Sequence, residues 1–147
     1  MKIQEIMTRD PSTVTPDATV REAAQLMKRE SVGILPVVSG SDSRKLVGVV
    51  TDRDIAIRCL ADGRNADCRV SEVMSSSPVA TCRVSDEVEK LMDAMRSEQV
   101  RRIPIVDERG SLVGIVSHAD VVRKAHGGSR TEAMLQGISE PGGRHAS

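Results

Sequence analysis

The chain of 147 residues contains no phenylalanine, tyrosine or tryptophan, so its core must be built from aliphatic side chains and methionine. A flat ligand base would lie between aliphatic side chains, and the aromatic platforms of a single-strand nucleic-acid binder are missing. The formal net charge is zero, with 21 basic and 21 acidic residues, which gives no global attraction to nucleic acid or to an anionic membrane. No apolar run approaches the length of a membrane span.

Motifs of the common catalytic classes are also missing. The chain has no P-loop, no GxGxxG between a strand and a helix, no GxSxG elbow and no HExxH or Cys/His cluster with metal-ligand spacing. We therefore predict that the protein is not an enzyme, has no catalytic residues and no metal site, and requires no cofactor. His118 fills a variable position of a repeated motif, and we interpret it as a solvent-exposed or cleft-rim residue.

Cysteine is scarce. Cys59, Cys68 and Cys82 are an odd number without CxxC spacing, which favours a reducing compartment over a disulfide framework. Residues 1–6 are amphipathic and do not have the pattern of a signal peptide. These features predict a cytoplasmic protein, and the cysteine spacing alone supports no particular bridge.

A short stretch occurs twice and organises the chain: LVGVVTDRDI at residues 46–55 and LVGIVSHADV at residues 112–121. Each begins with an apolar run rich in β-branched residues, which is typical of a buried strand. Asp54 and Asp120 then begin segments that look helical. The repeated hydroxyl and carboxylate are therefore predicted at a strand-to-helix corner, where free N–H groups and the helix dipole suit an anion.

Two interpretations of this corner stay open. Thr51 or Ser117, with free backbone amides, can hold a phosphate, while the carboxylate of Asp54 or Asp120 offers only acceptor sites and suits a ribose diol. Alternatively, these residues are helix caps, because both residue types are common there. Repetition does not decide the matter, since a repeated fold unit also repeats its caps.

The remaining segments repeat in the same order, so each half is predicted to be a β-α-β-β-α unit of an α/β (α+β) fold. Helix faces are predicted by two apolar stripes, Val20, Ala23, Ala24 and Met27 and then Val88, Leu91, Met92 and Met95. Thr19 with Glu22 predicts a capping box for the first helix, and Ser85 or Asp86 a cap for the second. The predicted boundaries are repeat 1 at residues 1–62, a linker at 63–69, repeat 2 at 70–126 and a flexible tail at 127–147.

The paired units, with LVGVVTDRDI and RRIPIVD at residues 101–107, resemble the two halves of a CBS domain pair (Bateman module), in particular the small stand-alone bacterial CBS-pair proteins. The resemblance covers about residues 3–124. It implies two repeats packed sheet to sheet with pseudo-twofold symmetry, a homodimer, and two clefts between the halves. In family members these clefts bind adenosine compounds, including AMP, ADP, ATP, NAD and S-adenosylmethionine.

The resemblance also implies roles for individual residues. The family's aspartate receives the ribose hydroxyls and its Thr/Ser faces phosphate; here these are Asp54 and Asp120, with Thr51 and Ser117. Apolar contacts to adenine are implied near four residues: Val14, Leu35, Thr81 and Ile103. Arg102 matches a family arginine that reaches phosphate, whereas the first repeat has Gly33-Ile34 at the matching place. Arg53 is a second candidate cation or, equally, an exposed residue at a helix start.

Three functions follow from these observations. The first is a regulatory sensor that binds an adenosine nucleotide and signals to an unknown protein target. The second is a structural or interaction protein with the same fold that binds no nucleotide, which the missing cation of the first repeat favours. The third is nucleic-acid binding, against which the neutral charge and absent aromatics count.

Overall fold

The computed structural model describes residues 1–40, 42–76 and 80–124, which form two compact units. Within these residues, unit 1 comprises 1–10, 80–108 and 113–124, and unit 2 comprises 11–40, 42–76 and 109–112. The predicted tail at residues 127–147 lies outside the described residues.

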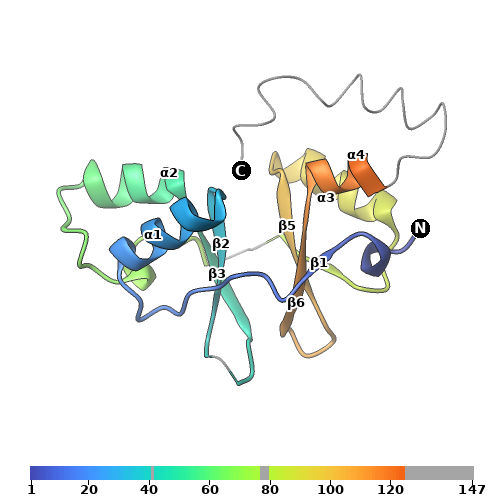
Figure 1. Ribbon diagram of the computed structural model, residues 1–147, viewed down its shortest axis with the longest axis horizontal. Helices are drawn as coiled ribbons and strands as arrows, with labels where there is room; N and C mark the ends of the chain where they lie inside the picture. Colours follow the sequence, from blue (N-terminus) through green and yellow to red (C-terminus); the bar gives the residue numbers. More distant parts are fainter. Residues whose placement is uncertain (41, 77–79, 125–147) are drawn as a thin grey trace. The chain divides into compact units, whose positions relative to one another are not determined.

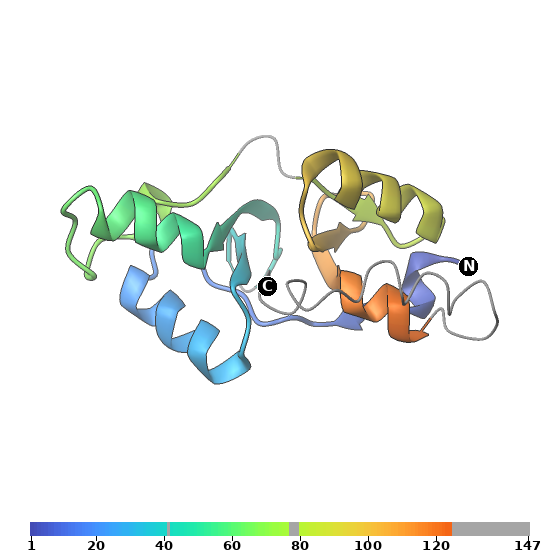
Figure 2. The ribbon, with the colours of Figure 1, turned by 90° about the horizontal axis from the view of Figure 1, so that it is seen from above.

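Unit 1 contains a four-stranded sheet of mixed direction with the order β1-β6-β5-β4 (Figure 1). Its strands are β1 (Thr8–Arg9), β4 (Cys82–Arg83), β5 (Arg102–Val106) and β6 (Leu112–Ser117). β1 runs antiparallel to β6, and β4 runs parallel to β5. Two helices, α3 (Val88–Glu98) and α4 (His118–Lys124), lie beside β5 and β6 (Figures 1 and 2).

Unit 2 repeats this arrangement in a reduced form. Its antiparallel pair is β2 (Ile34–Val38) and β3 (Leu46–Thr51), and single bridges extend the pair on both sides, from Val37 to Val14 and from Val49 to Ser75. Its helices are α1 (Val20–Glu30), the single turn α2 (Asp52–Asp54) and the wider-wound η2 (Ile55–Leu60), a π-helix that continues α2. The repeated order of helices and strands confirms the predicted mixed α/β class.

The first segment of each sequence repeat packs with the other repeat. The short 3₁₀ helix η1 (Ile3–Glu5) lies in unit 1, where the Ile3 N–H donates to the Asp86 carbonyl at 3.0 Å. Its counterpart η3 (Val70–Glu72) lies in unit 2, where the Val70 N–H donates to the Ala18 carbonyl at 2.8 Å. The compact units are therefore a different division of the chain from the repeats read along the sequence.

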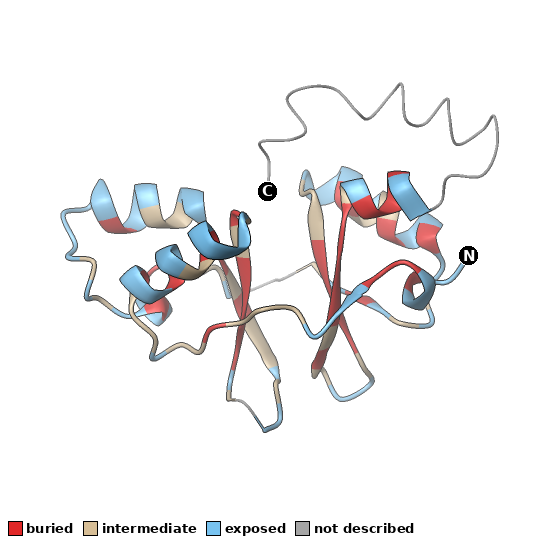
Figure 3. Ribbon diagram, in the orientation of Figure 1, coloured by how far each residue is buried: buried red, intermediate tan, exposed pale blue. Residues whose placement is uncertain are grey.

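Each unit has an aliphatic core between its helices and strands, and Figure 3 shows the buried residues on the strands and on one side of the helices. α1 contributes Val20, Ala23 and Met27, while Ala24 is exposed, so its predicted place in the apolar stripe was wrong. α3 contributes Val88, Leu91 and Met95 as predicted, with Met92 partly buried. The methionines thus fill space that aromatic side chains occupy in other cores.

One predicted helix cap is confirmed and one is wrong. Thr19 Oγ1 accepts the Glu22 N–H at 3.1 Å while Glu22 Oε1 accepts the Thr19 N–H at 3.0 Å, which is a complete capping box. α3 instead begins after Glu87, without a side-chain cap. Asp86 accepts the Arg83 N–H at 2.8 Å, and this hydrogen bond is the main reason why the pKa of Asp86 lies below its usual value. Asp86 therefore shapes the turn before α3 and does not cap the helix.

Candidate functional site

In unit 2 the predicted corner joins β3 to α2 at Thr51. The Asp54 N–H donates to Thr51 Oγ1 at 3.0 Å, and the Thr51 N–H donates to Asp54 Oδ2 at 3.0 Å. This reciprocal pair is a capping box that satisfies two backbone donors at the helix start. The other carboxylate oxygen, Oδ1, lies 4.0 Å from Arg58 Nε, beyond hydrogen-bond distance.

The corner of unit 1 joins β6 to α4 with the same geometry. The Asp120 N–H donates to Ser117 Oγ at 3.0 Å, and the Ser117 N–H donates to Asp120 Oδ2 at 2.9 Å. Here the second oxygen is engaged, because Arg123 Nη2 lies 2.5 Å from Asp120 Oδ1. Asp120 is also the more buried of the two aspartates, with 9% of its side chain exposed against 12% for Asp54.

Both corners therefore act as helix caps, the plainer of the two interpretations left open by the sequence. The cap uses only part of the hydrogen-bond acceptor capacity of each carboxylate. Each oxygen has two lone pairs, and only Oδ2 accepts a hydrogen bond in the cap. At Oδ1 the two aspartates differ, because Arg58 stays 4.0 Å from Oδ1 of Asp54 whereas Arg123 is hydrogen-bonded to Oδ1 of Asp120. The Arg123 side chain is 64% exposed, so it can turn away from Asp120.

Backbone hydrogen bonds bring the start of a neighbouring strand beside each corner. The Asp52 N–H donates to the Gly33 carbonyl at 2.8 Å, and the His118 N–H donates to the Arg101 carbonyl at 2.7 Å. Gly33 and Arg101 thus occupy equivalent places, as do Ile34 and Arg102, each the first residue of its strand. The difference in charge predicted between the two repeats therefore falls directly beside the two corners.

Arg102 contains a buried donor. Its Nε atom is buried without a hydrogen-bond partner among the described residues. A buried donor left without an acceptor costs about 1–3 kcal/mol, so an acceptor from outside the protein would be favourable here. Arg53, the other candidate cation, is exposed in the single turn of α2.

The four residues implied as adenine contacts lie in unequal settings. Leu35 and Ile103 are 1% and 0% exposed and belong to the cores of units 2 and 1. Val14 is 8% exposed, and Thr81 is exposed one residue before β4. Leu35 and Ile103 thus present almost no free surface, and the role of all four as ligand contacts stays a prediction.

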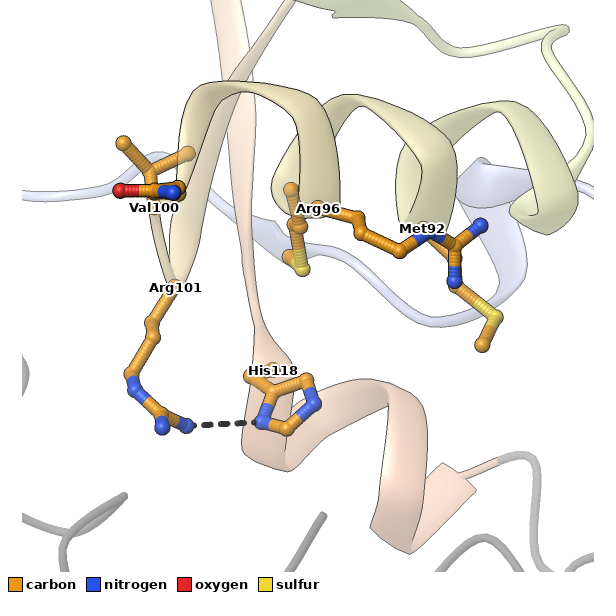
Figure 4. Close-up of a pocket in the computed structure, with 7 residues that line it drawn as sticks. Met92, Arg96, Val100, Arg101 and His118 are labelled. Carbon is orange, nitrogen blue, oxygen red and sulfur yellow. Dashed lines mark hydrogen bonds between the residues drawn. The ribbon is translucent and has the colours of Figure 1, made fainter. Parts of the chain in front are cut away.

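Sequence reasoning missed a pocket that adjoins the corner of unit 1. It has a volume of about 390 Å³ and lies against α3 and the first residue of α4 (Figure 4). Its lining combines apolar and cationic side chains: Met92, Met95, Arg96, Gln99, Val100, Arg101 and His118. The apolar stripe of α3 was a signal for part of it, but the sequence does not show that Met92 and Arg96 face the end of β6.

His118 and Arg101 form a hydrogen bond in this pocket, with Arg101 Nη1 3.1 Å from His118 Nδ1 (Figure 4). Arginine can only donate, so Nδ1 is the acceptor and the ring is neutral with its proton on Nε2. Burial lowers the pKa of His118 below its ordinary value of 6.5, and the charge of Arg101 lowers it further. Of the two alternatives given for His118, the structure agrees with a residue at the rim of a cleft, because His118 is partly buried and lines the pocket.

We predict that His118 titrates below pH 6.5 and that Arg101→Gln raises its pKa, because the variant removes the adjacent positive charge. NMR of the ring Cε1–H resonance against pH measures both, with His118→Asn to assign the signal. Because the folded state binds the proton more weakly than the unfolded state, the contribution of His118 to stability is complete above pH 6.5 and declines as the pH falls. A pKa of His118 at or above 6.5 in the unaltered chain would contradict the effect expected from its burial and from the charge of Arg101.

Within residues 1–40, 42–76 and 80–124, no three His, Cys, Asp or Glu side chains gather in a way that could hold a metal ion. In those ranges no helix combines the length and the apolar character needed to cross a bilayer.

Residues 3–60 and 70–127 each match the sequence model of the family described as "CBS domain". The CBS domain-containing protein YhcV of Bacillus subtilis is 39% identical over 137 residues, which cover 93% of this chain and 94% of YhcV.

Two solved structures are similar over most of the chain. Hypoxic Response Protein I, solved with two coordinated zinc ions, is 33% identical with a TM-score of 0.75, covering 84% of this chain and 98% of that one. CBSX2, solved in complex with AMP, is 30% identical with a TM-score of 0.71, covering 84% of this chain and 95% of that one.

Proposed function

This chain belongs to the CBS domain family, and from that premise we propose that it is a regulatory protein that binds an adenosine nucleotide at the two strand-to-helix corners. The observation that carries the proposal is the carboxylate at each corner, held in place by its cap through Oδ2 while Oδ1 takes no part in the cap. Such a carboxylate is oriented before the ligand arrives, so little ordering entropy opposes binding.

The ribose diol is the ligand group that fits this carboxylate. Two neighbouring hydroxyls can both donate to one carboxylate, and hydrogen bonds to a charged group contribute about 1.5–3 kcal/mol each. The AMP bound to CBSX2 supports an adenosine nucleotide as the ligand class. The chain lacks aromatic side chains, so affinity would have to come from the ribose and phosphate more than from stacking on the base.

The two corners are expected to differ in their preference for phosphate. Unit 1 places Arg101 and Arg102 beside its corner, whereas unit 2 places Gly33 and Ile34 there. The unpartnered Nε of Arg102 supports a phosphate oxygen as its acceptor. We therefore expect AMP to prefer unit 1 and unphosphorylated adenosine to prefer unit 2, where Oδ1 of Asp54 is less encumbered.

Regulation would require that the ligand binds one conformation of the protein more tightly than another. A ligand shifts a conformational equilibrium only by its difference in affinity for the two conformations. Neutralising Arg102 with a phosphate and drawing Arg123 away from Asp120 are two local changes that alter the surface of unit 1 on binding. That surface is what a protein partner would recognise, and neither change involves a catalytic step.

Isothermal titration of the full chain tests the proposal. AMP, ADP, ATP, NAD and S-adenosylmethionine are titrated separately, with 2′,3′-dideoxy-AMP as the matched control that lacks the diol. We expect saturable binding of at least one adenosine nucleotide and at least tenfold weaker binding of the dideoxy compound, since it loses the hydrogen bonds to the carboxylate. Equal affinity for AMP and its dideoxy form would contradict the assigned role of Asp54 and Asp120.

A protein that keeps the fold for structural or interaction purposes is the second candidate. Two observations favour it: the cap residues of each corner satisfy each other without a ligand, and Arg123 occupies the second oxygen of Asp120. If no adenosine compound in the titration series binds at millimolar concentration, this second function is the one that stands.

A further inference from the structure

Two cysteines lie side by side in unit 2. Cys59 sits on η2 and is completely buried, and Cys68, two residues before η3, is half-buried. Their sulfur atoms are 3.9 Å apart. The Cys59 Sγ also lies 3.7 Å from the carbonyl oxygens of Arg64 and Asn65, so the intervening turn folds back over the pair.

We propose that Cys59 and Cys68 are a redox-active dithiol, which a hydroperoxide converts to a disulfide within the chain. A disulfide requires a sulfur–sulfur distance of about 2.05 Å, so the two atoms must approach by roughly 1.9 Å. Cys68 lies in the turn-rich segment between η2 and η3 and not within a strand or helix. Rotation of its side chain and a small backbone shift can therefore supply this movement.

The reaction balances in two steps. The Cys68 thiolate attacks one peroxide oxygen, the O–O bond breaks, and the departing hydroxide takes up the thiol proton as water, leaving a sulfenic acid on Cys68. The Cys59 thiolate then attacks Cys68 Sγ, the S–S bond forms, the S–O bond breaks, and the second hydroxide leaves as water with the proton of Cys59. The two thiols together lose two electrons, which reduce the peroxide.

The surroundings of the two thiols determine that Cys68 reacts first with peroxide and how fast it is oxidised. Cys68 is the more accessible of the pair, so peroxide reaches it first. Burial and the neighbouring Cys59 raise the pKa of the Cys68 thiol above 9.0. Because the thiolate is the nucleophile, oxidation is slow at neutral pH and accelerates as the pH rises.

The third cysteine provides an internal control. Cys82 belongs to unit 1 and is buried in its core, whereas Cys59 and Cys68 belong to unit 2. Burial raises the pKa of its thiol as well. It has the same side-chain chemistry as Cys59 and Cys68, but no described cysteine lies beside it.

Peptide mapping of the oxidised full chain tests the proposal. Reduced protein is treated with hydrogen peroxide at pH 8.5, remaining thiols are blocked with N-ethylmaleimide, and the chain is digested with trypsin without reduction. Cleavage after Arg58, Arg64 and Arg69 places the two cysteines in separate peptides, residues 59–64 and 65–69, and Cys82 in residues 70–83. The expected product is the first two peptides joined by a disulfide, with Cys82 alkylated.

Thermal unfolding gives an independent measure. The disulfide closes a loop of residues 59–68, which restricts the unfolded chain and is expected to raise Tm by about 5–10 °C. Dithiothreitol should reverse the gain, Cys82→Ser should keep both the cross-link and the gain, and Cys68→Ser should lose both. Cys68→Ser changes only a half-buried position, so it stays informative if Cys59→Ser fails to fold.

Any other fate of the thiols overturns the proposal. Such outcomes are three alkylated cysteines after peroxide treatment, Cys68 carried to sulfinic acid with Cys59 still free, or a disulfide that links two chains. An effect on Tm that persists in Cys68→Ser would equally exclude this pair as its cause.

Discussion

Replacing Gly48 by alanine is expected to lower the free energy of unfolding by about 2–4 kcal/mol. A Cβ atom at this position would lie 2.7 Å from the carbonyl oxygen of Ser75 and 3.2 Å from Met74 Sδ. The same oxygen accepts the Val49 N–H at 2.9 Å, while the Ser75 N–H donates to the Val49 carbonyl at 2.9 Å. The added methyl group of alanine therefore displaces the backbone of Ser75, which is hydrogen-bonded to Val49. Backbone held in this way cannot relieve the clash by rotating, as a side chain could.

Gly114→Ala is expected to act in the same way in unit 1, with a smaller effect. Its Cβ would lie 2.9 Å from the Thr8 carbonyl oxygen, and its other close neighbour, Met7 Sδ at 2.7 Å, is the end of a flexible side chain. Gly40→Ala is the matched control, because nothing lies within 4 Å of the added atom. Urea unfolding followed by far-ultraviolet circular dichroism suits a chain without aromatic residues. Equal stability of Gly48→Ala and Gly40→Ala would contradict the close approach.

These glycines show how far the sequence could predict the structure. The repeated apolar run with one glycine correctly predicted β3 and β6, because β-branched residues and alternation are local signals. The reason for the glycine is not local. Gly114 faces Arg9 in the register of β1 and β6, about a hundred residues earlier in the chain. No periodicity along the sequence reveals that the first segment of each repeat packs in the unit formed mainly by the other repeat.

The helix after the first corner is another feature beyond the sequence. Residues 55–60 are wound as a π-helix, and the Ala61 N–H donates to the carbonyl of Ala56, five residues back. The matching helix α4 is regular over His118–Lys124. Nothing in IAIRCL distinguishes these two windings, because propensities rank residues for a helix and not for its pitch.

At the candidate site, the sequence supplied the residues but not their contacts. It predicted that Thr51 and Asp54 share a corner, and it left open whether they cap a helix or bind a ligand. The structure shows the cap, and the two oxygens of each carboxylate explain why the cap leaves room for a ligand. An arginine three or four residues after each aspartate was a usable signal, since such spacings bring side chains together on a helix. It did not reveal that Arg123 touches Asp120 while Arg58 stays 4.0 Å from Asp54.

The second large effect is expected from Asp120→Asn, which should weaken AMP binding at unit 1 about 10- to 100-fold, the equivalent of one charge-assisted hydrogen bond. Asparagine keeps an oxygen that can accept the Ser117 N–H, so the cap is preserved, but its second group is an NH₂ donor that cannot accept from a ribose hydroxyl. The variant thus separates the two roles of the side chain. Titration calorimetry measures the affinity, and thermal unfolding should show a change of only a few degrees.

Asp54→Asn serves as the matched variant in unit 2, where Gly33 and Ile34 occupy the places that Arg101 and Arg102 have in unit 1. It should weaken the binding of adenosine more than that of AMP, whereas Asp120→Asn should weaken AMP more than adenosine. Arg123→Gln is expected to strengthen AMP binding modestly, about twofold to fivefold, because it frees Oδ1 of Asp120 from a competing surface ion pair. If both asparagine variants bind AMP as the unaltered chain does, the carboxylates serve only as caps, and the ligand, if any, binds elsewhere.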